Sequence, residues 1–448
     1  AGMVGSSIAY HLSMRGFNCT VMDQRTNLLP PNDGGSENLD IDPGTATSSS
    51  FAWLNSNGKT PLSYKQLNQL GMEIWRRHDV LKHIPVWCGS LVQIARQGRV
   101  EDDCLPLKNR PYYSCLGPLD LEEKQRLEPG VAWPSDTAND QSEIYFYPEE
   151  GHVNPVEAVK LLRLAAHKNG VDFVGGVRIS HLVRNENDKV IGVEYRKSHA
   201  HHNEDASEQP ILAMADIVVV AAGANSSHPI LGVSSKKLQL LEQPGVLAYA
   251  RRKNIGNADD DSGHESRVLS RIFVDTIAQA HILRRPDKTI VIGGGQLVVG
   301  GKEDSSIQTT NTPPSRIASH SYFLNEEDTK VGNSMAKNAV TSIAPFELQP
   351  SSTSTDNSYE LVRVSRANRP MPYDGLPVIG FIEQGLYVAV THSGITLGPM
   401  IGELVSYELW YNKTITSEEG HGISMNGFQI LDNYRPSSSR FHEMGDSD

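Results

Sequence analysis

A pair of glycines at the start of the chain constrains its fold more than any other feature. The sequence opens with Gly2-Met3-Val4-Gly5, and residues 5–16 follow with apolar side chains at helical spacing. In the dinucleotide-binding turn G-x-G-x-x-G, the second glycine lets a pyrophosphate approach the backbone, and the third lets helix and strand pack closely. Gly2 and Gly5 fit these two positions. The first glycine, and the strand that carries it, would precede Ala1.

An acidic residue downstream supports this interpretation. Residues 17–22 form a short apolar run that predicts a buried strand, and Asp23 follows it. In this motif, an acid about 20 residues beyond the glycines accepts hydrogen bonds from ribose hydroxyls. The pyrophosphate would face the amides that begin the helix, because a helix start carries partial positive charge. The pattern therefore predicts a bound dinucleotide.

A second motif lies far along the chain and favours a flavin dinucleotide. Residues 215–220 form an apolar strand that runs into Ala222 and Gly223. Small side chains of this kind are expected where a strand passes beneath a bound cofactor. FAD domains of this type interrupt their nucleotide-binding unit with a long insertion, whereas NAD domains of the ordinary kind are continuous. The distance between the two motifs indicates FAD rather than NAD.

Length and charge narrow the class of protein. A chain of 448 residues predicts two lobes. The net charge of -12 argues against nucleic acid or an anionic membrane surface as a partner, since both attract basic patches. No apolar run approaches the roughly 20 residues of a membrane-spanning helix, so no span is expected.

The cysteines and a histidine cluster do not predict a metal site. The cysteines are Cys19, Cys88, Cys104 and Cys115, and they lack metal-binding spacing. A reducing compartment, either cytoplasm or an organelle matrix, is favoured over a disulfide scaffold. His199, His201 and His202 stand among acidic and polar residues, which is typical of a solvated loop.

The motifs toward the carboxyl end are more specific. Arg369-Pro370 precedes Asp374-Gly375-Leu376-Pro377-Val378-Ile379-Gly380, and Thr391-His392-Ser393-Gly394-Ile395-Thr396-Leu397-Gly398-Pro399 follows. With the opening glycine turn, Gly151 to Pro155 and Val218 to Gly223, they span nearly the whole chain. On these motifs the sequence resembles the D-amino acid oxidase family of FAD enzymes, which includes glycine oxidase, sarcosine oxidase and D-amino acid dehydrogenase.

The resemblance implies a substrate site. The arginine of the family's R-P-x-x-x-D-x-x-P-x-I-G pattern often binds the substrate carboxylate, and it corresponds to Arg369. A guanidinium binds a carboxylate bidentately and so orients the neighbouring Cα–H for hydride transfer to flavin N5. His392 is a candidate polar contact to substrate or flavin, with an ordinary loop histidine as the alternative.

The resemblance also implies cofactor contacts. The helix start at Gly394, Ile395 and Thr396 would stabilise negative charge on the flavin pyrimidine ring. Ser48 and Ser49 match a position lined by small residues, and Val177 matches one on the adenine side. Asn368 stands where a glycine commonly precedes the family's Arg-Pro. No cysteine is found near residues 363–368 for covalent attachment, so FAD is expected to be non-covalent.

The expected fold is a glutathione-reductase-type FAD-binding Rossmann domain, α/β in class, with an α+β substrate domain built on an antiparallel sheet. The FAD domain is predicted to comprise residues 1–60, 150–240 and 360–448. Residues 61–149 and 241–359 are predicted to form the substrate domain.

The expected reaction is oxidation of the C–N bond of a small amino acid or N-methyl amino acid. Electrons would pass to oxygen or another acceptor. Two alternatives stay open. One is a flavin-free remnant or scaffold of the same fold, and the other is an FAD-dependent 2-hydroxy acid dehydrogenase.

Overall fold

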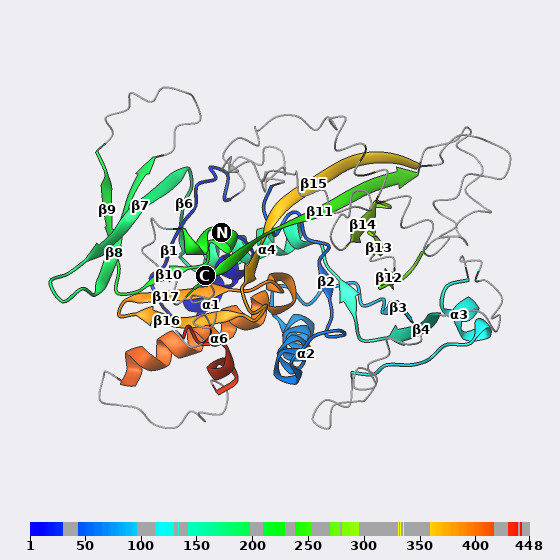
Figure 1. Ribbon diagram of the computed structural model, residues 1–448. Helices are drawn as coiled ribbons and strands as arrows, with labels where there is room; N and C mark the ends of the chain where they lie inside the picture. The colour runs from blue at the N-terminus through cyan, green and yellow to red at the C-terminus, as the bar shows by residue number, and fades with distance from the viewer. Residues whose placement is uncertain are drawn as a thin grey trace, which may run out of the picture. The chain divides into compact units, whose positions relative to one another are not determined.

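The computed structural model describes residues 1–29, 44–95, 113–129, 133, 142–197, 209–228, 238–252, 269–277, 280–294, 330, 332, 335, 359–415, 429–437 and 440 (Figure 1). The chain divides into two compact units. Unit 1 comprises Ala1–Pro85, Val153–Gly245 and Ala367–Asp448. Unit 2 comprises Val86–His152 and Val246–Arg366. Cys104 and the cluster at His199, His201 and His202 lie outside the described residues.

Unit 1 contains all but one of the described α-helices. They are α1 (Met3–Met14), α2 (Leu62–Arg77), α4 (Pro155–Lys168) and α6 (Gly394–Ile415). The α1 helix packs on α6 and α4, and α2 packs on α6. None of the helices in the described residues is both long and apolar enough to span a membrane.

The strands of unit 1 form small sheets. In one, β1 (Thr20–Met22) pairs in parallel with β6 (Asp172–Val174). In another, β17 (Leu386–Val390) lies between β10 (Val218–Val220), with which it is parallel, and β16 (Val378–Glu383), with which it is antiparallel. An antiparallel sheet has the order β7 (Val177–Arg184), β8 (Val190–Lys197) and β9 (Ile211–Met214). The short elements are β2 (Trp53–Leu54) and the 3-10 helices at Gly223–Ser227 and Gln429–Tyr434.

Local sequence explains where α4 begins and ends. The Asn154 side chain accepts hydrogen bonds from the amides of Val156 and Glu157, and Pro155 occupies the first helical turn. Both are favourable at a helix start. Gly170, at φ 91°, follows the helix end. These features account for a helix over 155–168.

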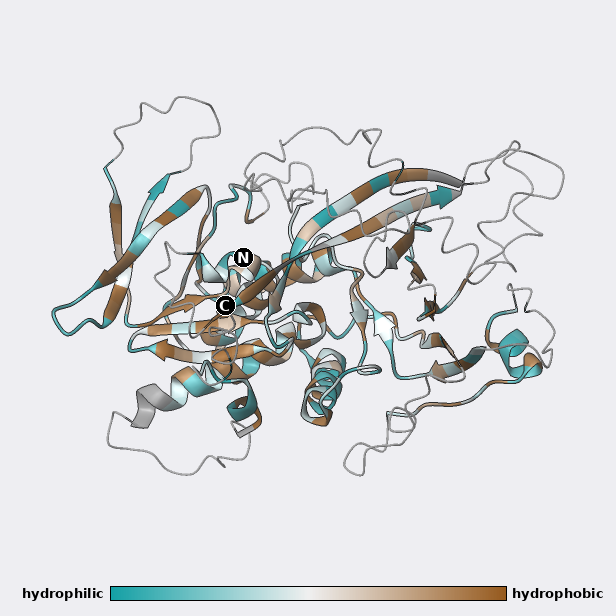
Figure 2. Cartoon of the chain, viewed as in Figure 1, coloured by the Kyte–Doolittle hydropathy of each residue, from teal (hydrophilic) through white to brown (hydrophobic). Residues whose placement is uncertain are grey.

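Apolar packing between α1, α2, α6 and the β16–β17 pair forms the main core of unit 1. Its fully buried residues include Leu67, Tyr387, Leu397, Ile401 and Val405. The strand β17 is buried at every position, in keeping with its apolar sequence, and it is brown along its length in Figure 2. The α2 helix carries both teal and brown residues, because one side faces this core.

Unit 2 is built on one mixed sheet. Its strand order is β15 (Tyr359–Pro372), β11 (Leu240–Arg252), β14 (Ile290–Gly294), β13 (Ala280–Arg284), β12 (Ile272–Asp275), β3 (Ser90–Ala95) and β4 (Ser142–Tyr147). The pairs β11–β14, β14–β13, β13–β12 and β3–β4 are antiparallel, and β12–β3 is parallel. The unit also contains β5 (Gly151–His152) and α3 (Leu121–Leu127), which begins at an Asp120–Glu123 capping box.

Two details differ from the sequence-based expectations. The strand expected over residues 215–220 begins only at Val218, as β10, and residues 211–214 form a separate strand, β9, in a different sheet. The first stretch of unit 1 extends to Pro85, where the predicted boundary was residue 60. The reason is α2, whose apolar side packs on α6 within unit 1.

Candidate functional site

The start of α1 has no acidic or side-chain cap. Gly2 is the N-cap residue and makes no side-chain hydrogen bond, and the first turn contains no acid. The amide of Met3 donates to Thr47 Oγ1 at 3.2 Å. A Cβ atom on Gly2 would lie 2.8 Å from that hydroxyl, so the turn has no room for a side chain there. The positive end of α1 is therefore available to an anion.

The third glycine of the motif packs beside the second motif. A Cβ on Gly5 would lie 3.6 Å from the Ala221 Cβ and 3.8 Å from the Ala221 carbonyl oxygen. Ala222 and Gly223 follow, and Gly223 has φ 62°, a conformation that favours glycine. The structure thus brings together the two motifs that the sequence analysis linked.

A buried cation lies under the start of α1. Arg163 of α4 is 1% exposed, and its guanidinium donates to the Leu28 carbonyl at 3.3 Å, to the Ala1 carbonyl and to Ser6 Oγ. Burial lowers the pKa of Arg163 to about 10, so the group still carries its positive charge near neutral pH. The sequence analysis missed this residue, although its position four residues after Val159 places it on the apolar face of α4.

Asp23 and Val177 are adjacent, as a shared role at the adenosine end requires. Asp23 follows β1, and its carbonyl accepts from the Val177 amide at 3.1 Å. The Asp23 carboxylate accepts from Arg25 Nε at 2.8 Å and Nη2 at 2.6 Å. Arg25 therefore holds the carboxylate in place beside the strand end.

The loop before β2 supplies a contact that differs from the predicted one. Ser48 is 5% exposed, and its Oγ lies 2.8 Å from Thr45 Oγ1. Ser49 donates its amide to the Thr45 carbonyl, which closes a turn. Between Thr45 and Ser48, Thr47 is the residue that contacts α1. The roles of Ser48 and Ser49 at the cofactor stay predictions.

The start of α6 lies next to the start of α1. A Cβ on Gly394 would lie 3.6 Å from Val4 Cγ2, and one on Gly398 would lie 2.5 Å from Met3 Cγ. The first turn of α6, like that of α1, contains no acid. Two uncompensated helix starts therefore converge in unit 1.

Side chains of α2 and β2 fix the start of α6. Tyr64 Oη donates to Ser393 Oγ at 2.7 Å, and Trp75 Nε1 donates to the Ile395 carbonyl at 3.0 Å. Thr396 Oγ1 donates to the Trp53 carbonyl at 3.2 Å. The Thr396 side chain thus anchors the helix, which leaves the backbone of this turn as the part that can face a cofactor.

Arg369 lies across a glycine of the neighbouring strand. A Cβ on Gly245 of β11 would be 2.6 Å from Arg369 Nε. Because glycine has no side chain, Gly245 leaves the space that the Arg369 side chain occupies. Burial lowers the pKa of Arg369, which means that the environment within the described residues does not fully compensate its charge.

His392 and Lys59 share this region with Arg369. The pKa of His392 is lowered to about 4, first by burial and then by the positive charges of Lys59 and Arg369. His392 is thus neutral near pH 7, beside two cations. The sequence analysis missed Lys59, whose position after the Asn57-Gly58 turn gave no signal of function.

The residues fit FAD. The glycines at Gly2 and Gly5 leave the backbone open, the two helix starts lack acids, and Arg163 adds a positive charge below α1. This combination suits a pyrophosphate at α1 and an electron-rich ring at α6. In the described part of the chain no group of His, Cys, Asp and Glu could hold a metal ion.

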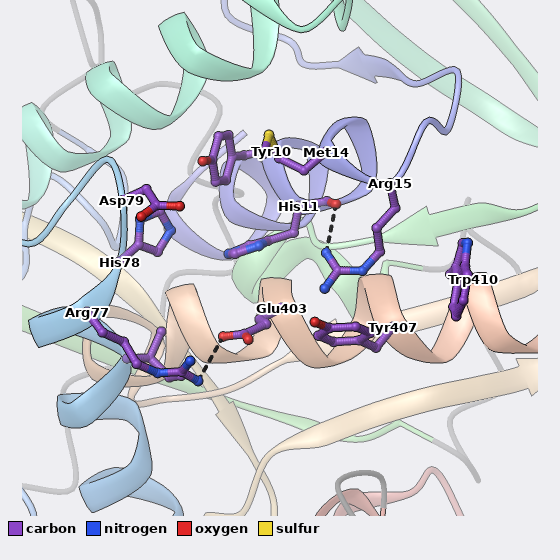
Figure 3. A pocket seen from close by; sticks show the side chains of 11 residues that line it. Tyr10, His11, Met14, Arg15, Arg77, His78, Asp79, Glu403, Tyr407 and Trp410 are labelled. Carbon is purple, nitrogen blue, oxygen red and sulfur yellow. Dashed lines mark hydrogen bonds and ion pairs between the residues drawn. The ribbon is translucent and has the colours of Figure 1, made fainter. Parts of the chain in front are cut away.

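A separate cavity of about 530 Å³ lies at the other end of α1 (Figure 3). Its described lining comes from the second half of α1, the end of α2 and the middle of α6, and includes none of the predicted site residues. The Arg77 guanidinium faces Glu403 at 3.4 Å, and Arg15 lies over the Tyr407 ring at 3.6 Å. Burial lowers the pKa of His11 to about 3 and that of His78 to about 4. This cavity is not the predicted cofactor site.

Comparison with known proteins identifies the family of this chain. The sequence profile of the FAD dependent oxidoreductase (DAO) family matches residues 1–408. A curated relative, 4-methylaminobutanoate oxidase (formaldehyde-forming) from Paenarthrobacter nicotinovorans, is 29% identical over 195 residues. The matched part is 43% of this chain and only 21% of that relative's length.

Solved structures share the fold. Iminodiacetate oxidase from Chelativorans sp. BNC1 aligns over 97% of each chain with a TM-score of 0.61 and 17% identity. L-proline dehydrogenase from P. horikoshii aligns over 97% of this chain and 96% of that chain, with a TM-score of 0.65 and 14% identity. Glycine oxidase from Bacillus cereus aligns over 92% and 93%, with a TM-score of 0.61 and 17% identity.

Proposed function

Because the chain belongs to the FAD dependent oxidoreductase (DAO) family, we propose that it oxidises the C–N bond of a small amino acid or N-methyl amino acid. The observation that carries this proposal is the group formed by Arg369, Lys59 and His392 in unit 1. The positive charges of Lys59 and Arg369 help to keep the imidazole of His392 neutral, and His392 lies two residues before the start of α6. An amino carboxylate has a carboxylate that can bind the two cations and an amine that can bind the neutral imidazole.

Arg369 binds the substrate carboxylate in this proposal. A guanidinium fork fixes a carboxylate in one plane, and charge-assisted hydrogen bonds of this type are worth about 1.5–3 kcal/mol. The carboxylate also compensates the buried charge of Arg369. Lys59 adds to the positive potential and makes the region selective for anions. Gly245 keeps the space for the Arg369 side chain open.

His392 acts on the amine end of the substrate. Its pKa of about 4 leaves the imidazole neutral at neutral pH, so one ring nitrogen can accept a hydrogen bond from a substrate N–H. This orients the nitrogen lone pair and favours the neutral amine, which is the form that can lose a hydride from carbon. His392 is therefore assigned a binding and orienting role.

FAD, when bound, supplies the acceptor for two electrons. The pyrophosphate would be held by the backbone at Gly2 to Gly5, the adenosine ribose by Asp23, and the flavin ring by the start of α6. The substrate carbon loses a hydride and its nitrogen loses a proton, which leaves a C=N bond. Water then adds to this imine, and the C–N bond breaks to release a carbonyl compound and an amine.

The named relatives support a substrate that combines an amine with a carboxylate. Iminodiacetate, L-proline and glycine are all amino carboxylates, and 4-methylaminobutanoate carries an N-methyl group. The shared chemistry is the amine and the carboxylate, which are the two groups that His392 and Arg369 are proposed to bind.

The test combines a spectrum with a substrate panel. Purified protein with bound FAD is mixed anaerobically with sarcosine, glycine, D-amino acids and 2-hydroxy acids, and the visible flavin absorbance is recorded. Bleaching by amino or N-methyl amino acids is expected, and repeat assays with oxygen and an artificial acceptor identify the electron acceptor. Bleaching by hydroxy acids alone contradicts the proposal, as does a purified chain that binds no FAD.

A further inference from the structure

A buried tyrosine in unit 2 contacts two arginines. Tyr249, in β11, is 2% exposed. The Arg363 guanidinium lies 4.0 Å from its ring centroid, and the Arg285 guanidinium lies 5.6 Å from it. Such cation–π contacts stabilise a guanidinium but leave its N–H groups needing acceptors.

Two of the three guanidinium nitrogens of Arg285 lack such an acceptor within the described residues, although the Tyr249 hydroxyl is near enough to raise the pKa of Arg285 by hydrogen bonding. Its Nε and Nη2 atoms are both buried, and neither has a hydrogen-bond acceptor within the described residues. The Tyr249 hydroxyl is also buried without a hydrogen bond of regular geometry. Most buried polar groups are hydrogen-bonded, and leaving a charged one unsatisfied is costly, so a missing partner is the natural explanation.

The two unsatisfied atoms form the side of the guanidinium that binds carboxylates elsewhere in this chain. Arg25 holds Asp23 through Nε at 2.8 Å and Nη2 at 2.6 Å. Arg440 holds Asp374 through the same atoms, at 2.8 and 2.9 Å. In Arg285 this same fork, Nε with Nη2, is buried and has no carboxylate partner in the part of the chain that the structure describes.

The charges near Arg285 do not replace a bound anion. Asp287, in the β13–β14 turn, is exposed, and its Oδ1 accepts from the Thr289 amide at 3.0 Å. Arg363 adds a second positive charge, and burial followed by this charge lowers the pKa of Arg285 although Tyr249 and Asp287 oppose the shift. His152 stays neutral near pH 7, because burial and Arg285 lower its pKa to about 4.

We propose that Arg285, with Tyr249 and Arg363, forms a binding site in unit 2 for a small organic carboxylate. The carboxylate accepts two hydrogen bonds from Arg285 Nε and Nη2, as Asp23 does from Arg25. Arg363 contributes positive potential, and the Tyr249 hydroxyl supplies a further donor. The site is distinct from the Arg369 group of unit 1 in its residues, and its ligand is either the amino acid substrate itself or a separate carboxylate.

The test measures the thermal stability of the FAD-loaded protein with acetate, at constant ionic strength adjusted with chloride. Acetamide serves as the neutral isostere. The wild type is expected to gain about 2 °C or more at concentrations far above the dissociation constant, since a ligand of the native state stabilises it. Acetamide is expected to give no gain. Equal gains from acetate and acetamide contradict a carboxylate site.

Two substitutions of Arg285 assign the response, and both are made in the Arg369→Ala background so that acetate bound at the proposed active site does not contribute. Arg285→Met removes the charge but keeps the length of the side chain, and it is expected to abolish the acetate gain. Arg285→Lys keeps the charge but loses the fork, so at least a tenfold weaker acetate response is expected. Arg284→Met is the matched control, because it removes one positive charge from the last residue of β13 and leaves the Arg285 fork intact. An acetate gain that survives in Arg285→Met overturns the proposal.

An Arg369→Ala variant separates this site from the proposed active site. It is expected to keep the acetate gain even if amino acid turnover is lost, so the two proposals can fail independently. Competition in the Arg369→Ala variant then identifies the ligand. A saturating amino acid substrate that removes the acetate gain identifies the substrate as the occupant, and an unchanged gain identifies a separate carboxylate. A crystal structure with one of the chain's own carboxylates in the Arg285 fork contradicts binding of either ligand at this site.

Discussion

The two units of this protein differ in the groups that they present to negatively charged ligands. Unit 1 uses the backbone: two helix starts without acids, opened by Gly2, Gly5 and Gly394. Unit 2 uses long side chains on a sheet, where Arg285 and Arg363 flank Tyr249. The cations near the start of α1 in unit 1 already have partners, since Arg163 donates to carbonyls and Arg25 to Asp23. The backbone site is therefore sensitive to added volume, whereas the side-chain site is sensitive to charge.

Acid is expected to have the largest effect, and to affect unit 1 more than unit 2. Buried histidines of unit 1 have low native pKa values, about 3 for His11 and about 4 for His78 and His392. The unfolded chain binds protons near pH 6.5 while the native state does not, so stability is lost as pH falls from about 6.5 toward 4. Between pH 6.5 and 4, each histidine contributes at most about 3 kcal/mol to this loss of stability.

Hydrogen exchange at several pH values measures this difference between the units. Protection of α1 and α6 is expected to fall before that of β12 to β14, because His152 is the histidine with a similarly low pKa, about 4, among the described residues of unit 2. His78→Gln is expected to flatten the pH dependence of unit 1. Equal acid sensitivity in both units would show that other groups dominate.

A side chain at Gly2 is expected to abolish tight binding of FAD. Gly2→Val would displace the Thr47 hydroxyl, 2.8 Å from the new Cβ, and block the approach to the α1 amides. We expect FAD to bind about 100-fold more weakly, or ~2.7 kcal/mol. Flavin fluorescence titration measures this. Met14→Val, at an exposed position of the same helix, is the control and is expected to leave FAD binding unchanged.

Loss of the Arg369 charge is expected to affect substrate binding more than FAD binding. Arg369→Ala should raise KM for amino acids about 10- to 100-fold, the range expected for charge-assisted hydrogen bonds. Arg369→Lys should recover only part of the loss, because an ammonium lacks the planar fork. Steady-state kinetics with FAD saturating measure both variants. An unchanged KM in Arg369→Ala removes this residue from the substrate site.

The smallest effect is expected when added volume at Gly245 displaces the charged side chain of Arg369. Gly245→Ala would place a Cβ 2.6 Å from Arg369 Nε, which forces that flexible side chain to move. KM should rise about 10-fold or less, and the melting temperature should change little, since only a mobile side chain is displaced. A large fall in melting temperature with unchanged KM would show that Gly245 serves the sheet and not the arginine.

Much of the fold was predictable because its signals are local. The helix over 155–168 has its Asn154 cap, its Pro155 and an apolar face within one segment. The glycine turn before α1 and the strand before Asp23 are equally local patterns. The separation of β9 from β10 was not predictable from the sequence. It follows from the tertiary structure, since the two strands join different sheets on either side of residues 215–217.

The candidate site was predictable in part for the same reason. Residues inside a motif, such as Gly2, Gly394 and Arg369, were found from spacing and resemblance. Residues that reach the site from other elements were missed, as Thr47, Arg163 and Lys59 show. A lysine after a turn is typical of a solvent-exposed position, so nothing in its own neighbourhood distinguished Lys59. The position of Arg163, four residues after Val159 on the apolar face of α4, was a signal that could have been used.

The sequence alone determined the nucleotide-binding turn, the flavin-type interruption of the domain and the family, because these depend on short-range patterns of glycines and apolar residues. Only the tertiary structure decided which charges are compensated. Whether a guanidinium is satisfied depends on acceptors that lie far away in sequence, as Leu28 does from Arg163. The sequence alone does not distinguish Arg285 from Arg440. In the structure, Arg440 binds Asp374, whereas the Nε and Nη2 atoms of Arg285 are buried without an acceptor among the described residues.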